Sequence, residues 1–287
     1  MTKLLDGREL AGFIKERQAH VVRGMRSRKV FPKLVIVRDS DNPVIVKYVN
    51  LKKRYGEDIG VEVVDQKIDA VSSTNALEAA KKVILDANED PSVSGIIVQL
   101  PLTGTSYTDE IVNLIAPEKD VDGLNQAIET KTNAHGDNPK LAQKRKFESA
   151  TATAINWLLA GHGIDLPGKR VALVGYGRLV GQPLKRIFDN SGVSADVFRH
   201  DSDLSKLADY DVIISATGVP HLITSDMVSG GAVVVDAGTA SEDGVLVGDV
   251  DDAVRERADL SAITPKTGGV GPLTVGVLFE DVIQAAE

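Results

Sequence analysis

The sequence alternates along its whole length between apolar runs rich in β-branched residues and segments of helical spacing. This alternation is typical of an α/β protein with mostly parallel strands. Val171 to Val174 form an unbroken apolar run, which predicts a central strand buried on both faces of a parallel sheet. The predicted strands are 33–40, 61–68, 94–102, 169–177, 194–200, 210–218 and 231–239, and the predicted helices include 43–56, 74–87 and 272–286.

The strands form two groups, one on each side of a loose polar stretch at about residues 131–146. We therefore predict two α/β lobes with a cleft between them. The first lobe is expected to span residues 1–147 and to be joined by the C-terminal helix 272–287, while residues 148–271 form the second lobe. The chain shows no internal repeat of the length typical of solenoids.

Composition limits the classes of function. The chain has 287 residues and no cysteine, so disulfide scaffolds, thiolate zinc sites, iron–sulfur clusters and thiol nucleophiles are excluded. Its net charge of −8 argues against a nucleic-acid partner. No apolar run reaches the roughly 18 residues of a membrane span. We therefore expect a cytoplasmic protein that binds neither nucleic acid nor membrane.

The negative charge is concentrated in the second part of the chain. Residues 1–146 carry 23 basic and 21 acidic side chains, a balance of +2, whereas residues 147–287 carry 10 and 20, a balance of −10. A mildly basic first lobe would suit an anionic substrate, although scattered solvated lysines explain the same value.

A glycine-rich loop follows the predicted central strand. Gly175, Gly177 and Gly181 are spaced G-x-G-x-x-x-G and precede a segment in helical register. Such a loop lets backbone amides approach a pyrophosphate at a helix N-terminus, which predicts a Rossmann-like dinucleotide-binding lobe. The spacing is one residue longer than the common fingerprint, and an ordinary strand-to-helix turn is the alternative. Further candidates after later strands are Thr217, Gly218 and Thr239.

The next strand ends in Arg199, His200 and Asp201, where a ribose-binding group is expected. Asp201 would suit the free ribose hydroxyls of NAD and repel the additional phosphate of NADP. Arg199 and Arg178 favour NADP instead. Solvated surface residues are the third possibility, and the sequence leaves all three open.

The first lobe contains a tyrosine, a lysine and a glutamine that are candidates for proton transfer or ligand binding. Tyr48 and Lys52 are four residues apart, so a helix places both on one face. Lys53 and Arg54 are expected to lower the pKa of Lys52, and a desolvated lysine exchanges protons near neutral pH. Gln99 ends a buried strand, where open α/β sheets place ligands. A solvated lysine and a half-buried tyrosine are the alternatives.

Acidic residues follow in the segment PEKDVDGLN, which contains Asp120 and Asp122 before Gly123. The spacing of a calcium-binding loop is absent, so no metal site is predicted. Turn or cap formation is the alternative role for one of the two carboxylates.

Together these segments resemble the bifunctional methylenetetrahydrofolate dehydrogenase and methenyltetrahydrofolate cyclohydrolase family. The resemblance is collinear over nearly the whole chain, and its most specific motifs are GIIVQLPL, KDVDG and GGVGPLT. It implies oxidation of 5,10-methylenetetrahydrofolate by a nicotinamide dinucleotide and hydrolysis of the methenyl product to 10-formyltetrahydrofolate. One-carbon metabolism, purine biosynthesis, tetrahydrofolate derivatives as partners and a homodimer formed through the nucleotide lobes are further implications.

The resemblance also implies roles for individual residues. Lys52 would transfer the proton in the cyclohydrolase step, Gln99 would tune the lysine, and Tyr48 would contact the folate. Asp122 would hold the pteridine ring. The implied folate contacts also include Leu100, Pro101, Gly268, Gly269 and Pro272, and the implied dinucleotide contacts are Gly175, Tyr176, Gly177, Gly181, Asp201, Thr217, Gly218 and Thr239.

The chain departs from the family pattern on the cofactor side. The family usually has Gly-Arg-Ser where this chain has Gly175, Tyr176 and Gly177, and a serine where this chain has Asp201. The family implies NADP, whereas these three substitutions (Tyr176, Gly177 and Asp201) leave NAD open. The usual Pro-Cys-Thr-Pro is Ser-Ala-Thr-Ala at 149–152.

Alternatives remain at this stage. A monofunctional cyclohydrolase or dehydrogenase of the same family would retain part of this chemistry. A shikimate-type or amino-acid-type dehydrogenase would explain the glycine loop and an active lysine, but not the three specific motifs together. A catalytically inactive folate-binding or nucleotide-binding protein would leave Lys52 without an evident use.

Overall fold

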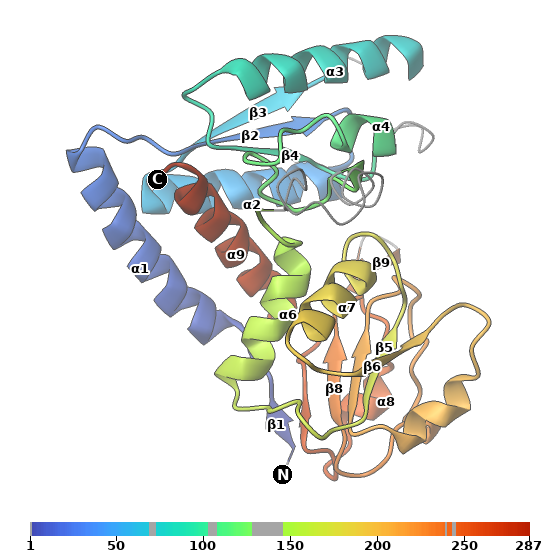
Figure 1. Cartoon of the computed structure of the whole chain (residues 1–287). Coiled ribbons are helices and arrows are strands. Elements are labelled where there is room, and N and C mark those ends of the chain that lie inside the picture. The colour runs from blue at the N-terminus through green and yellow to red at the C-terminus, as the bar shows by residue number, and fades with distance from the viewer. Residues whose placement is uncertain (1, 69–72, 103–107, 128–145, 239, 243–244) are drawn as a thin grey trace. The chain divides into compact units, whose positions relative to one another are not determined.

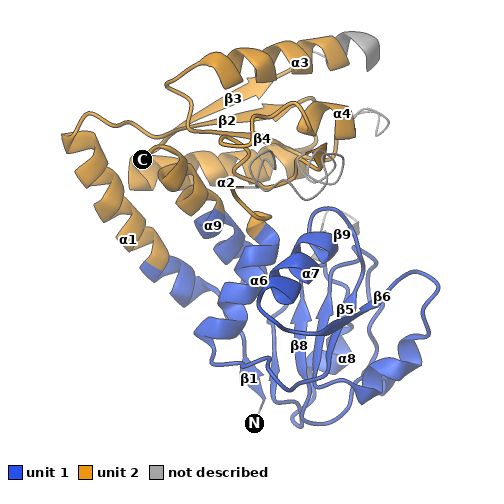
Figure 2. Cartoon of the chain, in the orientation of Figure 1, with its two compact units in different colours: residues 1–13, 151–277 blue, residues 14–150, 278–287 orange. Residues whose placement is uncertain are grey.

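The computed structural model describes residues 2–68, 73–102, 108–127, 146–238, 240–242 and 245–287. It forms two compact units (Figure 2), of which unit 1 is Met1–Phe13 with Thr151–Val277 and unit 2 is Ile14–Ala150 with Leu278–Glu287. The chain passes from unit 2 to unit 1 between residues 150 and 151. The sequence analysis placed residues 1–13 with the first lobe, but in the structure they group with unit 1 because their strand pairs in its sheet.

The core of unit 1 is a parallel six-stranded sheet with the order β1-β11-β8-β7-β5-β6. These strands are β1 (Lys3–Leu4), β5 (Val171–Val174), β6 (Ala195–Phe198), β7 (Val212–Ser215), β8 (Val233–Asp236) and β11 (Ala262–Ile263). β5 is fully buried between β7 and β6. The predicted central parallel strand and the α/β fold class are therefore confirmed.

The remaining elements of unit 1 are helical segments and a small hairpin. They are α6 (Ala150–Gly161), α7 (Gly181–Asn190), η2 (Leu204–Asp209), η3 (Ser225–Met227), α8 (Asp252–Arg255) and the antiparallel pair β9 (Ala240–Glu242) and β10 (Val245–Val247). The sequence analysis did not predict β1, β11 or the hairpin. Strands of two or three residues are too short to show a two-residue hydrophobic period.

Unit 2 contains a parallel three-stranded sheet in the order β3-β2-β4. Its strands are β2 (Lys33–Arg38), β3 (Glu62–Lys67) and β4 (Gly95–Val98). Its helices are α2 (Pro43–Ile59), α3 (Ser73–Glu89), α4 (Thr108–Val112), most of α1 (Arg8–Ser27) and the second part of α9 (Val270–Ala285). Figure 1 shows α3 on one face of this sheet and α2 on the other.

The sheet of unit 2 brings distant residues together at one edge. Since all three strands are parallel, their carboxyl ends share that edge, and Gln99 follows β4 there. A buried apolar cluster beneath α3 and α4 includes Val37, Ile84, Ile96 and Ile111. This cluster holds β4 in register, and β4 in turn positions Gln99.

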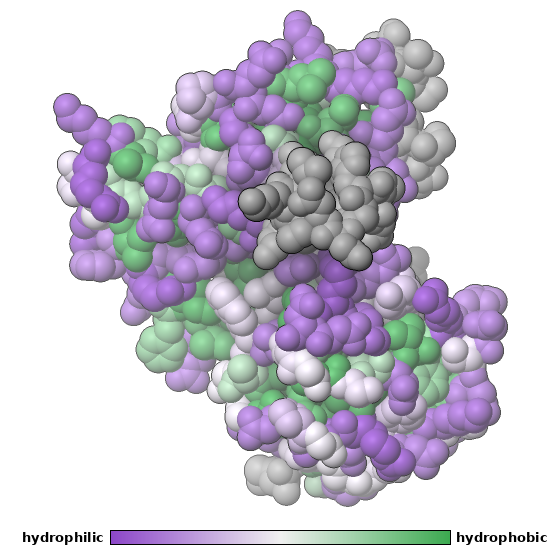
Figure 3. Space-filling model, in the orientation of Figure 1, coloured by the Kyte–Doolittle hydropathy of each residue, from purple (hydrophilic) through white to green (hydrophobic). Residues whose placement is uncertain are grey.

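The described part of the chain contains no helix long and apolar enough to cross a membrane. Figure 3 shows hydrophilic side chains over much of the visible face of each unit, with apolar side chains between them.

Candidate active site

The first cluster, in unit 2, joins Lys52 to Gln99. Asn42 caps α2 by accepting a hydrogen bond from the Val44 amide at 2.9 Å, and Pro43 provides a favourable first position. The helix then places Tyr48 and Lys52 one turn apart, both half-buried. Lys52 Nζ donates to Gln99 Oε1 at 2.6 Å across 47 residues of sequence. The structure thus brings the predicted lysine and glutamine into direct contact.

Burial governs the charge of this cluster. It lowers the pKa of Lys52, an effect that Asp122 opposes. Burial also raises the pKa of Asp122 to about 7, opposed by Lys52 and by a hydrogen bond from the Ala150 amide. Each group is therefore shifted towards its neutral form, and a neutral amine is able to accept a proton.

Of the two effects considered from the sequence, desolvation is the one that lowers the pKa of Lys52. Repulsion by Lys53 and Arg54 is not among the causes of the shift. Residues next to each other on a helix point in different directions, so proximity in sequence does not bring the charges of Lys53 and Arg54 to the Lys52 amine. Burial also raises the pKa of Tyr48, so its hydroxyl keeps its proton and is able to donate a hydrogen bond.

The turn after residue 119 separates the roles of the two carboxylates. Asp120 is buried and accepts hydrogen bonds from the amides of Leu124 at 3.2 Å and Asn125 at 2.8 Å. Gly123 has a φ of +62°, and a Cβ atom there would lie 2.5 Å from the backbone of Glu148. Asp120 therefore stabilises the turn, whereas Asp122 interacts with Lys52.

Leu100 and Pro101, two predicted folate contacts, directly follow Gln99. The Leu100–Pro101 peptide is cis. Gln99 Nε2 donates to the Leu100 carbonyl at 3.3 Å, while its Oε1 atom accepts from Lys52. Both ends of the glutamine amide are thus oriented by neighbours.

Asp281 is a residue of this unit that the sequence analysis missed. It lies on α9, and burial together with Glu280 and Asp122 raises its pKa to about 8. The packing around Gly95 shows that Asp281 and Asp122 lie near each other. Val121, next to Asp122, and Val282, next to Asp281, both lie against that glycine. Two adjacent acidic residues in an otherwise apolar helix form no recognisable motif, so only the fold relates Asp281 to Asp122.

The second cluster, in unit 1, is the glycine loop between β5 and α7. Gly175 has a φ of +96°, and its amide donates to the Phe198 carbonyl at 2.9 Å. A Cβ atom on Gly181 would lie 2.3 Å from the Gly175 carbonyl oxygen, whereas one on Gly177 would meet nothing within 4 Å. Val180, at the N-cap of α7, makes no side-chain cap hydrogen bond. The loop is therefore tight on its inner side and open at Gly177, beside a helix N-terminus suited to a phosphate group.

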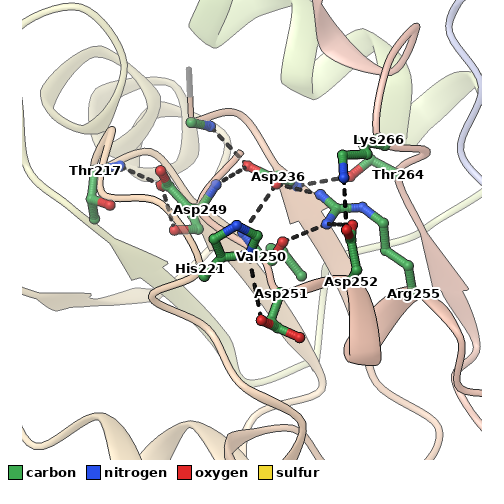
Figure 4. Close-up of polar contacts among 12 residues, drawn as sticks. Thr217, His221, Asp236, Asp249, Val250, Asp251, Asp252, Arg255, Thr264 and Lys266 are labelled. Carbon is green, nitrogen blue, oxygen red and sulfur yellow. Dashed lines mark hydrogen bonds and ion pairs between the residues drawn. The ribbon is translucent and has the colours of Figure 1, made fainter. Parts of the chain in front are cut away.

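A buried carboxylate network supports the neighbouring loop (Figure 4). Asp249 accepts hydrogen bonds from the Thr217 amide at 2.6 Å and the Ser215 hydroxyl at 2.7 Å. Asp236 accepts from the Asp249 amide at 3.1 Å and pairs with Arg255 at 2.5 Å. Burial raises the pKa of Asp236, and Arg255 opposes the shift.

This network fixes the loop that contains two predicted cofactor residues, Thr217 and Gly218. Asp249 and Arg255 were given no role from the sequence. Hydrogen bonds to the Asp236 carboxylate, rather than spacing along the chain, connect the three residues. Thr239, another predicted cofactor residue, lies outside the described residues.

Three predicted folate residues belong to unit 1, not to the unit that carries Lys52. Gly268 has a φ of +90°, and its carbonyl accepts from the Gly7 amide at 2.8 Å. Gly269 approaches Gly7 so closely that a Cβ atom on Gly7 would lie 2.1 Å from its carbonyl oxygen. Pro272 lies in the first turn of α9. The folate role of these residues stays a prediction.

Comparison with known proteins identifies the family. Residues 5–122 match the catalytic domain of tetrahydrofolate dehydrogenase/cyclohydrolase, and residues 149–287 match its NAD(P)-binding domain. The chain belongs to the tetrahydrofolate dehydrogenase/cyclohydrolase family. Its members include the bifunctional protein FolD of Lactobacillus delbrueckii subsp. bulgaricus, which is 39% identical over 99% of this chain and 97% of that protein.

Solved structures of the family agree with the fold. The bifunctional FolD of Campylobacter jejuni has a TM-score of 0.87 and 33% identity, covering 100% of this chain and 99% of that one. The Trypanosoma brucei FolD, solved with NADP and an inhibitor, has a TM-score of 0.85 and 29% identity, covering 99% and 97% of the two chains.

Family membership decides between the alternatives left open by the sequence. Both family domains are present, so the chain is a bifunctional NAD(P)-dependent dehydrogenase and cyclohydrolase of tetrahydrofolate derivatives. A shikimate-type or amino-acid-type dehydrogenase is not favoured.

Proposed function

We propose that Lys52 is the proton-transfer residue of the cyclohydrolase step, that Gln99 orients it, and that Asp122 and Tyr48 bind the folate. The observation that carries this assignment is the 2.6 Å hydrogen bond between Lys52 Nζ and Gln99 Oε1, beside a carboxyl group whose pKa is about 7. A buried amine with a lowered pKa and a fixed direction has the properties required of a general base at neutral pH.

In the hydrolytic step, a water oxygen bonds to the electrophilic methenyl carbon and Lys52 takes the proton that the water loses. The carbon–nitrogen bond to N5 of the folate then breaks as the hydroxyl of the adduct loses its proton and becomes the formyl carbonyl. N5 takes up one proton in its place, and Lys52 releases the other to solvent, so that one proton is set free for each 10-formyltetrahydrofolate formed. Gln99 accepts a hydrogen bond from the amine throughout, which limits the directions in which its lone pair points. Asp122 shares the low-dielectric surroundings and stabilises Lys52 once the amine is protonated.

The dinucleotide is proposed to bind at the loop formed by Gly175, Tyr176, Gly177 and Gly181. The open space at Gly177 and the N-terminus of α7, where the N-cap Val180 makes no side-chain hydrogen bond, suit a pyrophosphate group. NADP, when bound, accepts the hydride of methylenetetrahydrofolate at its nicotinamide ring. Thr217, whose amide donates to Asp249, and the neighbouring Gly218 are proposed to contact the nicotinamide riboside. Asp201 and Thr239 are the remaining proposed contacts.

Lys52→Met tests the assignment. The variant should lose cyclohydrolase activity by about 10²–10⁴-fold, the usual contribution of a general base, while the dehydrogenase reaction continues. Both are followed by the absorbance of the methenyl compound, which forms in one step and disappears in the other. Lys47→Met is the matched control, because Lys47 is exposed on the same helix. Unchanged hydrolysis in Lys52→Met would refute the role of Lys52.

The same assays separate the bifunctional enzyme from a monofunctional one. A wild-type chain that hydrolyses the methenyl compound but reduces neither NADP nor NAD would be a cyclohydrolase alone. We also propose a cytoplasmic homodimer that supplies one-carbon units for purine biosynthesis, in which unit 2 carries the catalytic residues of the folate domain. Light scattering coupled to gel filtration tests the dimer.

A further inference from the structure

Tyr176 and Arg199 meet at the carboxyl ends of two adjacent strands. β5 and β6 pair in parallel with Val174 opposite Phe198, so both chains leave the sheet at the same level. The Cζ atom of Arg199 lies 4.3 Å from the centroid of the Tyr176 ring. At this distance the guanidinium is attracted to the face of the ring.

This contact orients Arg199 without neutralising it. Its side chain is exposed, and no carboxylate among the described residues lies within 4 Å of its guanidinium. Stacking occupies one face of the group and leaves the N–H donors at its edges available. Arg38 and Arg255, by contrast, are paired with Asp65 and Asp236.

The backbone around Arg199 is also fixed. The Arg199 amide donates to Ser202 Oγ at 2.8 Å, and the Ser202 amide donates to the Arg199 carbonyl at 3.0 Å. This turn holds the residue directly after β6. A dinucleotide bound at the glycine loop of a parallel sheet places its adenosine ribose at the end of the second strand, which is the position of Arg199.

We infer that Arg199, held by stacking on Tyr176, binds the 2′-phosphate of the dinucleotide and makes this enzyme prefer NADP to NAD. The inference rests on the proposed dinucleotide site at the glycine loop and names the group that selects between the two cofactors. A guanidinium presents parallel donors that match phosphate oxygens in a bidentate arrangement.

Asp201 is the competing group at this site, since a carboxylate there repels a phosphate. It is exposed, and no hydrogen bond or ion pair anchors its side chain within the described residues. Arg199 is anchored by both the stack and the turn. The fixed cation therefore dominates over a carboxylate that is free to rotate into water.

The test uses two nucleotide fragments, 2′,5′-ADP and 5′-AMP, that differ only by the 2′-phosphate. Calorimetric titration of the full-length protein measures their Kd values. Arg199→Gln should weaken the binding of 2′,5′-ADP about 10- to 100-fold, the range expected for the loss of a charged hydrogen bond. It should change the Kd of 5′-AMP less than about twofold. Arg170→Gln is the matched control, because Arg170 is an exposed arginine just before the other end of β5.

Two variants of Tyr176 test the stack itself. Tyr176→Phe keeps the aromatic face and should retain the preference for 2′,5′-ADP. Tyr176→Leu removes the aromatic face and should weaken the binding of 2′,5′-ADP about two- to fivefold. The midpoint of thermal unfolding, measured for each variant, serves as the control for retention of the fold.

Three results would overturn the inference: wild-type protein that prefers 5′-AMP, an Arg199→Gln variant that binds 2′,5′-ADP as tightly as wild type, or equal losses for both fragments. If wild-type protein binds neither fragment and reduces neither dinucleotide, the proposed dehydrogenase site fails as well. In the Arg170→Gln control, the affinities for both fragments and the rate of methenyl hydrolysis should all equal those of wild type.

Discussion

Two glycines of the same loop provide a sharp test of the dinucleotide site. A Cβ atom on Gly181 would lie 2.3 Å from the Gly175 carbonyl oxygen and 2.7 Å from Tyr176 Cα, both of them backbone atoms. Neither atom is the end of a flexible side chain, so the loop or the start of α7 has to move. Overpacking of this kind costs about 1–3 kcal/mol.

Gly181→Ala should therefore destabilise unit 1. With about 2–4 °C per kcal/mol for a domain of this size, the midpoint of thermal unfolding should fall by about 2–12 °C. Gly177→Ala should leave that midpoint unchanged, because its methyl group enters open space. The same methyl group occupies the side of the loop where the pyrophosphate is expected, so Gly177→Ala should instead weaken dinucleotide binding.

Calorimetric scanning measures the unfolding midpoint, and titration with the dinucleotide measures the affinity. The pair of variants separates stability from binding, since one change acts on the packing of the loop and the other on its open side. A Gly181→Ala protein as stable as wild type would refute the packing argument. A Gly177→Ala protein with wild-type dinucleotide affinity would show that the open side is not the binding side.

Three further predictions follow from the charged groups. Gln99→Glu places a carboxylate against Lys52, which should raise the lysine pKa and move the pH profile of hydrolysis to higher pH by about one unit or more. Gln99→Met, the control, should lower the hydrolysis rate without that shift. A pH profile that does not move in Gln99→Glu would contradict the contact between the two side chains. Arg255→Ala leaves Asp236 buried without its cation and should lower the free energy of unfolding of unit 1 by about 3 kcal/mol, as measured by denaturant titration. A decrease below about 1 kcal/mol would show that the backbone amides alone satisfy the carboxylate. Because the pKa of Asp281 is raised to about 8, the stability that its protonated form contributes is complete in acid and is lost as the pH rises through 8. Asp281→Asn should therefore stabilise unit 2 at pH 9 more than at pH 5, by a difference above about 1 kcal/mol, and equal effects at the two pH values would refute the shift.

The sequence by itself determined the class of fold and the positions of the strongest elements. Unbroken apolar runs such as Val171–Val174 predict buried parallel strands, and the observed β5 covers that run, inside the predicted strand 169–177. The regular spacing of 43–56 predicted α2, which extends three residues further to Ile59. Hydrophobic period and turn residues are local properties, so they are visible without the fold. The collinear motifs likewise indicated the family.

Tertiary structure decided the relations between distant residues. Asp120 and Asp122 are equivalent in the sequence, but the turn at Gly123 directs one to backbone amides and the other to the electrostatic surroundings of Lys52. The stack of Arg199 on Tyr176 depends on the register of two strands, and the lowered pKa of Lys52 depends on burial rather than on its neighbours. Desolvation and contact are properties of packed surfaces, which chain positions alone do not specify. The sequence thus named the lysine and the glutamine, and the folded chain set the distance between them.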